Sequence, residues 1–293
     1  MSRASAWALA ARPRTLPAAA APVLVGSALA WHLGGFRLLP ALAALVGALL
    51  IQVATNLAND YFDFMKGADA EDRVGPVRVT QAGLLAPGTV RGGMVVALLA
   101  AVLVGAYLVS VGGWPIFWIG VASLICAVAY TGGPFPLAYH GLGDLFVFVF
   151  FGLVAVAGTT YVQMLEFRWE ALWAGVGVGA VSTALLVVNN LRDIQTDLRA
   201  GKRTMAVRLG VSGTRVQYTL LWSLAASVPV VGIGLYRWPS TVLLAVLGLV
   251  AAGNAVRAVW EFEKPEELLD ALPTTALGLM VYALGLSLGL LLN

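Results

Sequence analysis

Residues 38–63 read LLPALAALVGALLIQVATNLANDYFD, and this stretch decides the class of protein to which the chain belongs. Positions 38–59 form a run of 22 residues without a charge, and Asp60 and Asp63 follow directly after it. A helix of about 20 apolar residues crosses roughly 30 Å of hydrocarbon. The stretch therefore predicts a membrane-spanning helix that ends in a carboxylate-bearing segment at the membrane surface.

Stretches of the same kind recur along the whole chain. Those of 19 to 23 residues are 15–36, 38–59, 145–165, 171–191, 216–236, 238–256 and 271–293. An eighth, 92–143, is 52 residues long, and the turn signal Gly112-Gly113-Trp114-Pro115 divides it. The pattern predicts an all-α integral membrane protein, one domain over residues 1–293, with nine transmembrane helices around a central cavity open to the cytoplasmic side. We expect these helices near 15–36, 38–62, 92–111, 115–131, 144–165, 171–192, 216–236, 238–257 and 271–292.

The composition excludes several classes of protein. Of the 293 residues, 60% are hydrophobic and 11% are charged, whereas a soluble domain carries about 25% charged residues. An ordinary cytosolic globule and a disordered chain are therefore excluded. The balance of 18 basic and 15 acidic residues speaks against nucleic-acid binding. Cys126 is the one cysteine, which excludes a disulfide framework and a cysteine-based metal site.

The distribution of charge predicts an orientation in the cell membrane. With nine spans, 15 of the 18 basic residues fall on the side that holds the N-terminus. The positive-inside rule places that side in the cytoplasm, and Asn293 outside. Of the 15 acidic residues, 13 fall on the same side, although the rule does not require this. We therefore expect a multi-pass protein whose chemistry takes place at its cytoplasmic face.

Two matched polar clusters lie at the cytoplasmic ends of predicted helices. In each cluster an asparagine and two aspartates share one helix face, namely Asn56, Asp60 and Asp63 in the first and Asn189, Asp193 and Asp197 in the second. A polar, basic loop follows each cluster, at 75–81 and at 201–204. Both helices reach the cytoplasm at their C-terminal ends, so the clusters can face each other across one cavity.

Stacked carboxylates at a helix C-terminus repel one another, and the helix dipole adds to this cost. Mg²⁺ relieves it, because this cation takes carboxylate oxygens together with phosphate oxygens. Lysine and arginine in the adjoining loops would neutralise the rest of a diphosphate. A role as helix caps at the interface would explain one such cluster. Capping alone is a weaker explanation for two clusters of matching spacing on one side of the membrane.

Longer strings of sequence carry a family resemblance. They are Arg12–Pro17, Asn56–Asp63 with Gly75–Gln81, Tyr130–Pro134, and Asn189–Asp193 with Gly201–Thr204. These strings resemble the UbiA superfamily of intramembrane aromatic prenyltransferases, and within it the 1,4-dihydroxy-2-naphthoate polyprenyltransferases. The chain departs from the general first motif at Gly67, where many members have aspartate, and Asp69 follows two residues later. A role for Asp69 is left open.

The resemblance implies transfer of a polyprenyl group from polyprenyl diphosphate to 1,4-dihydroxy-2-naphthoate with decarboxylation, giving demethylmenaquinol in menaquinone biosynthesis. It implies that Mg²⁺ is held by Asp60, Asp63, Asp193 and Asp197, with Asn56 and Asn189 assisting. The substrates would contact Asn59, Lys66, Arg73, Arg78, Lys202 and Arg203, with Arg12 and Arg14 at the mouth toward the anionic acceptor. The ring face of Tyr130 could stabilise the allylic cation. Roles for His140 and Asp144 stay open.

Two other functions compete with this one. A superfamily member could use another acceptor, such as 4-hydroxybenzoate, a haem or a chlorin. An ion-coupled transporter could use the same carboxylates to bind coupling ions. Transporters place their ion sites near the bilayer midplane, whereas here charged residues occur only at the ends of the predicted spans, which disfavours transport.

Overall fold

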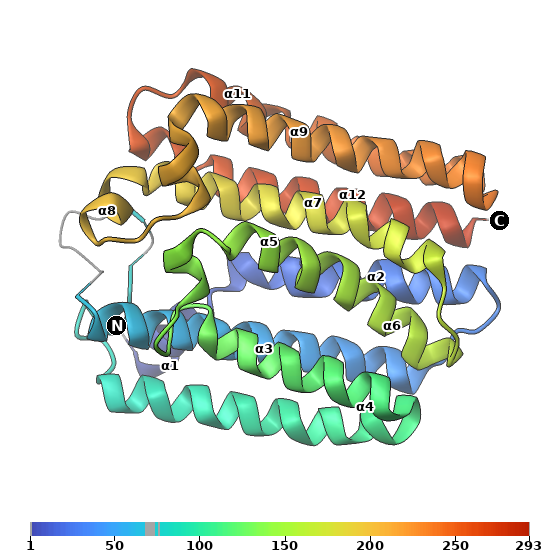
Figure 1. Ribbon diagram of the computed structural model, residues 1–293, viewed down its shortest axis with the longest axis horizontal. Coiled ribbons are helices and arrows are strands. Elements are labelled where there is room, and N and C mark those ends of the chain that lie inside the picture. The colour runs from blue at the N-terminus through green and yellow to red at the C-terminus, as the bar shows by residue number, and fades with distance from the viewer. Residues whose placement is uncertain (1, 68–73, 76, 293) are drawn as a thin grey trace.

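The computed structural model describes residues 2–67, 74–75 and 77–292, and within them every regular element is helical. The longer helices are α2 (Leu16–His32), α3 (Leu38–Met65), α4 (Pro87–Ala129), α7 (Trp169–Arg192), α9 (Met205–Tyr236) and α12 (Ala271–Leu291). The shorter ones are α1 (Arg3–Ala11), α5 (Gly143–Val147), α6 (Ala155–Met164), α8 (Ile194–Arg199), α10 (Leu247–Ala251) and α11 (Gly253–Glu261). The long helices lie side by side along one direction (Figure 1).

The membrane character of the fold follows from the length and hydropathy of these helices. Among the described residues, seven helical segments are long and apolar enough to cross a membrane. They are Leu38–Met65, Pro87–Ala129, Gly143–Met164, Trp169–Arg192, Met205–Tyr236, Ser240–Glu261 and Pro265–Leu291. The predicted all-α, multi-pass membrane fold is thereby confirmed. The number of nine crossings stays a prediction, because α2 has only 17 residues and the two arms of α4 count as one continuous segment.

Helix α4 contains the turn that the sequence predicts at Gly112–Pro115. Gly113 has φ 68° and ψ −154°, a non-helical conformation that an L residue rarely adopts. Pro115, two residues later, cannot donate a backbone hydrogen bond into the helix. The chain therefore turns at Gly113, and the second arm of α4, residues 114–129, runs back beside the first (Figure 1).

The C-terminal end of α3 differs from the expected bound, whereas that of α7 agrees with it. Helix α3 continues to Met65 rather than ending at 62, so Asp63 lies within it. Helix α7 ends at Arg192, and Asp193 (φ −93°, ψ 8°) bends the chain into α8. The helix face predicted to carry Asn189, Asp193 and Asp197 is therefore bent at Asp193. The backbone amide of Asp193 still donates to the carbonyl of Asn189 (3.2 Å), and that of Asp197 donates to the carbonyl of Asp193 (2.8 Å).

Small residues allow α7 to pack at the centre of the bundle. A Cβ on Gly152 would lie 2.5 Å from both the carbonyl oxygen of Gly175 and the Cα of Gly179. Gly152 belongs to a π-helical stretch, Phe148–Val154, that joins α5 to α6. Of the best membrane-spanning window of α7, 78% is buried, against 17% for α4. The protein thus has a dense core around α7, with the α3–α4 pair toward the outside.

Candidate active site

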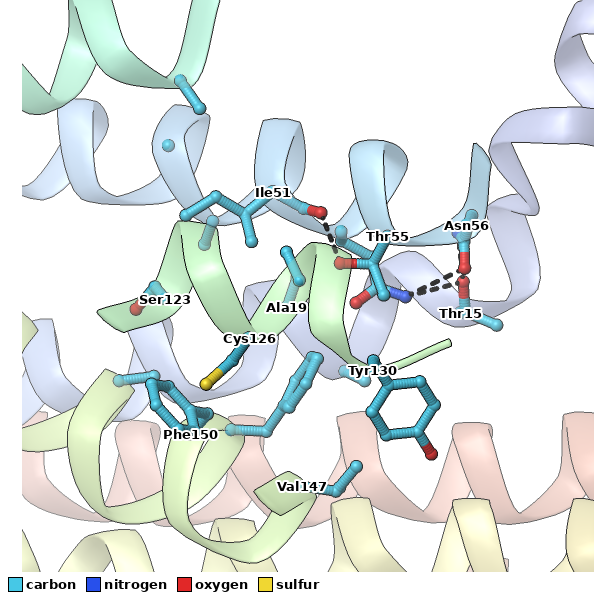
Figure 2. Close-up of a pocket in the computed structure, with 18 of the residues that line it drawn as sticks. Thr15, Ala19, Ile51, Thr55, Asn56, Ser123, Cys126, Tyr130, Val147 and Phe150 are labelled. Atoms are coloured by element: carbon cyan, nitrogen blue, oxygen red, sulfur yellow. Dashed lines mark hydrogen bonds between the residues drawn. The ribbon is translucent and has the colours of Figure 1, made fainter. Parts of the chain in front are cut away.

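A cavity of about 1010 Å³ lies between the α7 core and the α3–α4 pair. Its polar end is lined by Arg14, Asn59, Asp63, Arg78, Asn189 and Lys202. Its deeper part is lined by apolar groups that include Phe117, Ile119, Phe150 and Val154. Figure 2 shows Thr15, Asn56 and Tyr130 toward one end, and Cys126 and Phe150 toward the other. The cavity is therefore shaped for a molecule with a polar head and a long apolar tail.

Asp63 faces this cavity and is held by two donors. Arg78 Nη2 donates to Asp63 Oδ2 at 2.9 Å, and the hydroxyl of Tyr139 donates to Asp63 Oδ1 at 2.9 Å. The side chains of Asp63 and Arg78 are both buried, so the Coulomb attraction between them is screened less than in an exposed ion pair. The predicted diphosphate contact Arg78 thus lies directly beside the predicted metal ligand.

Asp60 faces away from the cavity, toward the loop that carries Arg78. Its carboxylate accepts from the amides of Val79 (3.1 Å) and Thr80 (3.0 Å) and from the hydroxyl of Thr80. Asp60 does not belong to the cavity lining, in contrast to Asp63. Because three donors converge on one buried carboxylate, Asp60 fixes the loop in place in this structure.

The second cluster is likewise paired with cations of its own. Arg192, which is 4% exposed, binds Asp193 in a bidentate manner with distances of 2.7 and 2.8 Å, and its Nη2 also donates to Asn189 Oδ1 at 2.8 Å. Lys202 Nζ lies 3.4 Å from Asp197 Oδ1. Asn189 and Lys202 line the cavity, whereas Asp193 and Asp197 lie just behind them.

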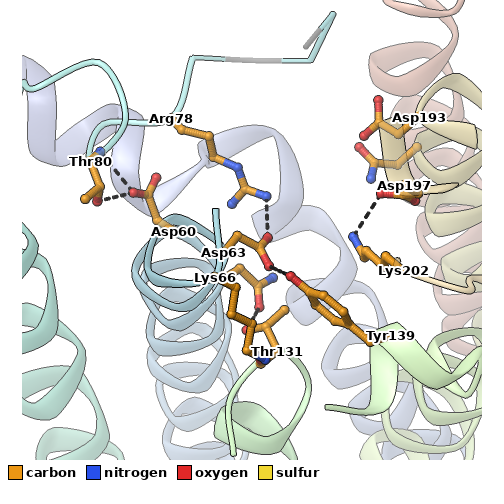
Figure 3. Close-up of polar contacts among 12 residues, drawn as sticks. Asp60, Asp63, Lys66, Arg78, Thr80, Thr131, Tyr139, Asp193, Asp197 and Lys202 are labelled. Atoms are coloured by element: carbon orange, nitrogen blue, oxygen red, sulfur yellow. Dashed lines mark hydrogen bonds and ion pairs between the residues drawn. The ribbon is translucent and has the colours of Figure 1, made fainter. Parts of the chain in front are cut away.

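Tyr139 connects the two clusters (Figure 3). Lys66 Nζ lies 4.6 Å from the centroid of its ring, and Lys202 Nζ lies 5.8 Å from it. Lys66 also donates to the carbonyl of Thr131 at 2.5 Å. Partial desolvation of the ammonium group lowers the pKa of Lys66, and the charge of Asp63 opposes this shift. The structure thus brings the two predicted clusters together on opposite sides of one aromatic ring.

Tyr130 lies between carboxylates of both clusters. Burial of its hydroxyl raises its pKa far above the ordinary value, and the charges of Asp144, Asp197 and Asp63 raise it further. The phenol is therefore neutral at any physiological pH. Tyr130 lines the cavity where its polar and apolar parts meet, which is the position that the predicted cation-stabilising role requires.

Asn56 is engaged with the N-terminal turn rather than with the aspartates. Its Nδ2 donates to the carbonyl of Ala11 at 2.8 Å and to Thr15 Oγ1 at 2.9 Å (Figure 2). Gln52 Nε2 donates to Asn56 Oδ1 at 3.4 Å and to Thr15 Oγ1 at 3.1 Å. Asn56 therefore attaches the turn before α2, and with it Arg12 and Arg14, to α3.

The remaining predicted residues lie as follows. Arg12 and Arg14 line the cavity, and Asn59 Oδ1 accepts from Thr131 Oγ1 at 2.9 Å. Arg203 does not belong to the lining, and its amide donates to Tyr139 O at 3.0 Å. His140 stacks on Phe135 with ring centroids 3.7 Å apart, and Asp144 accepts from Gln217 at 2.6 Å. Arg73 and Asp69 lie outside the described residues.

The chemistry of the cavity's polar end suits a hard cation. Carboxylate and amide oxygens from Asp63, Asn59 and Asn189 are the ligand type that Mg²⁺ prefers. In the part of the chain that the structure describes, no three histidine, cysteine or acidic side chains are grouped closely enough to hold a metal by themselves. The oxygens therefore fit a metal that shares its ligand sphere with a second molecule, such as a diphosphate.

Several residues of the site were not singled out from sequence. Tyr139, Thr80, Arg192 and Gln52 each make one of the contacts that hold the cavity's polar end. Arg192 and Thr80 lie within the strings Asn189–Asp193 and Gly75–Gln81 that carry the family resemblance, and Arg192 is also next to Asp193. The partners of Thr80, Gln52 and Tyr139 lie 20, 37 and 76 positions away along the chain, so the sequence does not indicate those contacts.

The sequence is similar to known proteins over almost its entire length. The UbiA prenyltransferase family matches residues 19–269. The chain is 40% identical to the 1,4-dihydroxy-2-naphthoate octaprenyltransferase of Mycobacterium tuberculosis, over 98% of this chain and 97% of the relative. It is 35% identical to the enzyme of that name from Haemophilus influenzae, over 98% and 96%. The solved structure of a UbiA homolog from Archaeoglobus fulgidus bound to GPP and Mg²⁺ has a TM-score of 0.68 at 12% identity, over 96% of this chain and 99% of that one, which shows likeness of fold.

Proposed function

Because the chain belongs to the UbiA prenyltransferase family, we propose that it transfers a polyprenyl group from polyprenyl diphosphate to 1,4-dihydroxy-2-naphthoate. Diphosphate and CO₂ leave, and demethylmenaquinol forms. The observation that carries this proposal is the meeting of two carboxylate clusters, through Tyr139, at the polar end of a largely apolar cavity. The names of the full-length relatives support this acceptor.

The polar end supplies the groups that a leaving diphosphate needs. Arg78 and Lys202 line the cavity, and Lys66 lies against the same ring as Lys202. Their charges would stabilise the negative charge that develops on the diphosphate as the allylic C–O bond breaks. Asp63, Asn59 and Asn189 would hold Mg²⁺ there, with Asp193 and Asp197 close behind. When bound, this ion neutralises diphosphate oxygens as a Lewis acid. A related fold binds GPP and Mg²⁺, which is consistent with divalent metal use here.

The next part of the cavity protects the allylic cation. The ring face of Tyr130 offers negative electrostatic potential to a cation, and its hydroxyl does not ionise. Phe150, Val154 and Ile119 continue the lining and exclude water from the reactive carbon. Their apolar surface also accepts the isoprenoid tail.

The acceptor then attacks with its electron-rich ring. A new C–C bond joins the allylic carbon to the ring, the bond to the carboxylate breaks, and its electron pair stays with the ring as CO₂ leaves. A hydroquinone ring is sufficiently nucleophilic that a strong base is not required. His140, stacked on Phe135 outside the cavity lining, is not needed for this step.

The enzyme is a multi-pass membrane protein. We place its N-terminus in the cytoplasm and its C-terminus outside, because 15 of the 18 basic residues then lie on the cytoplasmic side. In this orientation the polar end of the cavity opens toward the cytoplasm, where a soluble naphthoate and a diphosphate head group can reach it.

The experiment that tests the function compares acceptors. The purified protein in lipid nanodiscs is given a polyprenyl diphosphate, Mg²⁺ and either 1,4-dihydroxy-2-naphthoate or 4-hydroxybenzoate. We expect turnover of the naphthoate with release of one CO₂ for each diphosphate. Turnover of 4-hydroxybenzoate alone would assign the chain to another acceptor class. Ion flux into sealed vesicles without any prenyl transfer would instead support a transporter.

A further inference from the structure

The network around Thr15 leaves one acceptor atom without a donor. Thr15 Oγ1 donates its proton to the carbonyl of Arg12 (3.0 Å) and accepts from both Gln52 Nε2 and Asn56 Nδ2. Asn56 Nδ2 also donates to the carbonyl of Ala11, which fixes the orientation of the Asn56 amide. Gln52 must therefore present its NH₂ group to Thr15 and Asn56, and its carbonyl oxygen points elsewhere.

That oxygen, Gln52 Oε1, is buried and has no hydrogen-bond donor among the described residues. Gln52 as a whole is 8% exposed, and it lines the cavity. A buried polar atom without a hydrogen-bond partner destabilises the folded protein. An unpaired acceptor atom of this kind in a substrate cavity indicates that a bound molecule supplies the missing hydrogen-bond donor.

The position of Gln52 along α3 agrees with the place of an acceptor ring. Gln52 lies seven residues, or about 10 Å at 1.5 Å per residue, deeper than Asn59 at the diphosphate end. Arg12 and Arg14 line the cavity from the turn that Thr15 closes. Within the described residues no acidic side chain pairs with Arg14. A ligand with an anionic group beside this turn would pair with Arg14, and a hydroxyl on the same ligand would donate to Gln52 Oε1.

We propose that the turn Arg12–Thr15 and Gln52 form the binding site for the aromatic acceptor, with Gln52 Oε1 accepting a hydrogen bond from the 4-hydroxyl and Arg14 binding the carboxylate. The hydroxyl at position 1 is next to the carboxylate and bonds to it internally, so the 4-hydroxyl is the donor that remains. This inference rests on the proposed function. Gln52 would then be a specificity-determining residue, because it gives a hydroquinone acceptor a higher binding affinity than an acceptor without the 4-hydroxyl.

The test measures binding with paired ligands. Wild-type protein in nanodiscs, with Mg²⁺ and the unreactive geranyl thiolodiphosphate, is titrated anaerobically with 1,4-dihydroxy-2-naphthoate and with 1-hydroxy-2-naphthoate. The second ligand lacks only the 4-hydroxyl. We expect it to bind about fivefold to tenfold more weakly, the effect of one neutral hydrogen bond. Equal affinities would overturn the assignment of Gln52, even if no variant could be purified.

The variant Gln52→Met completes the comparison. Without the carbonyl, the two ligands should differ by no more than about twofold. The matched control is Gln163→Met, because Gln163 is also buried, on another helix, but does not line the cavity. It should keep the wild-type ratio. Arg14→Gln should weaken both ligands by the same factor, because both carry the carboxylate.

The outcomes separate this inference from the function on which it rests. Turnover of 1,4-dihydroxy-2-naphthoate together with equal binding of the two ligands would overturn the Gln52 site alone. Turnover of 4-hydroxybenzoate but not of the naphthoate would overturn the function, and the site with it. A ligand preference that persists in Gln52→Met would also overturn the site.

Discussion

The Tyr139 hydroxyl donates a 2.9 Å hydrogen bond to Asp63 Oδ1, across 76 positions of sequence. The ring of the same tyrosine lies against Lys66 on one side of the site and Lys202 on the other. A single aromatic side chain from the segment after α4 therefore sets the spacing of the two clusters. The orientation of Asp63 depends on that segment as much as on α3.

Tyr139→Phe should keep the ring contacts and remove the hydrogen bond to Asp63. We expect kcat/KM for the polyprenyl diphosphate to fall about tenfold to a hundredfold, the effect of one hydrogen bond to a charged carboxylate. The KM for the naphthoate should not change. Steady-state kinetics with each substrate varied in turn checks this. Tyr107→Phe, on the exposed face of α4, is the control, and equal losses in both variants would contradict the prediction.

Asp60→Ala and Asp193→Ala should each abolish Mg²⁺-dependent turnover without preventing membrane insertion. For Asp60 the structure predicts a loss through the loop, since the carboxylate holds the amides of Val79 and Thr80. Thr80→Val, which removes one of three donors, should lower kcat/KM about tenfold. Asp63→Asn should raise the Mg²⁺ concentration needed for half-maximal rate, and Thr80→Val should not. Full activity of Asp60→Ala would refute the role of Asp60.

Arg192→Ala should destabilise the protein strongly, because it leaves the buried carboxylate of Asp193 without its bidentate partner. Breaking a buried pair in this way costs about 3–5 kcal/mol. The double variant Arg192→Ala with Asp193→Asn should recover much of that stability, because no charge is then left unpaired. Thermal unfolding in detergent, followed by circular dichroism, measures both. A double variant as unstable as the single one would argue against the pair.

Lys66 should make diphosphate binding sensitive to alkaline pH. Partial desolvation lowers the pKa of Lys66 in the folded protein below that of the unfolded chain, 10.5. The unfolded state therefore binds more protons between these two values, and Lys66 opposes folding below its folded pKa. This penalty is relieved as the pH rises through the folded pKa toward 10.5.

Over the same interval the ammonium loses its charge, so the KM for polyprenyl diphosphate should rise in the wild type. Lys66→Arg keeps the charge at all these pH values and should show a flatter profile. Measurement of KM against pH for both proteins checks this. Parallel profiles would mean that Lys66 does not contribute to diphosphate binding.

The fold was largely predictable because it follows from local sequence. An apolar run such as 38–59 specifies a helix whatever it packs against, and Gly113 with Pro115 specifies a turn. The ends of helices were predicted less well. Helix α3 continues to Met65 and α9 begins at Met205, both beyond their apolar runs, because the polar residues next to such a run can be helical without a hydrophobic pattern to mark them.

The charged residues of the site could be predicted from their residue type, but their hydrogen-bond partners could not. Asp63, Arg78 and Lys202 stood out because charge is rare in this chain, and they do lie together. Asn56 and Asp60 share a helix face with Asp63, yet they face the N-terminal turn and the Arg78 loop respectively. Which neighbour a side chain contacts depends on how distant helices pack. Gln52 and Tyr139, and the contact of Thr80 with Asp60, could therefore be recognised only from the structure.

The aspartates that carry the two clusters each have a donor from the chain itself, among them Arg78 for Asp63, Arg192 for Asp193 and Lys202 for Asp197. A metal ion that approaches alone must compete with these internal cations, and a diphosphate that approaches alone must compete with the carboxylates. Together they would exchange partners, with Arg78 and Lys202 binding phosphate and the carboxylate oxygens becoming available to hold the metal. By thermodynamic linkage each ligand would then raise the affinity of the other by the same factor. The resting enzyme would thus discriminate against free metal and free diphosphate, and admit the two as a complex.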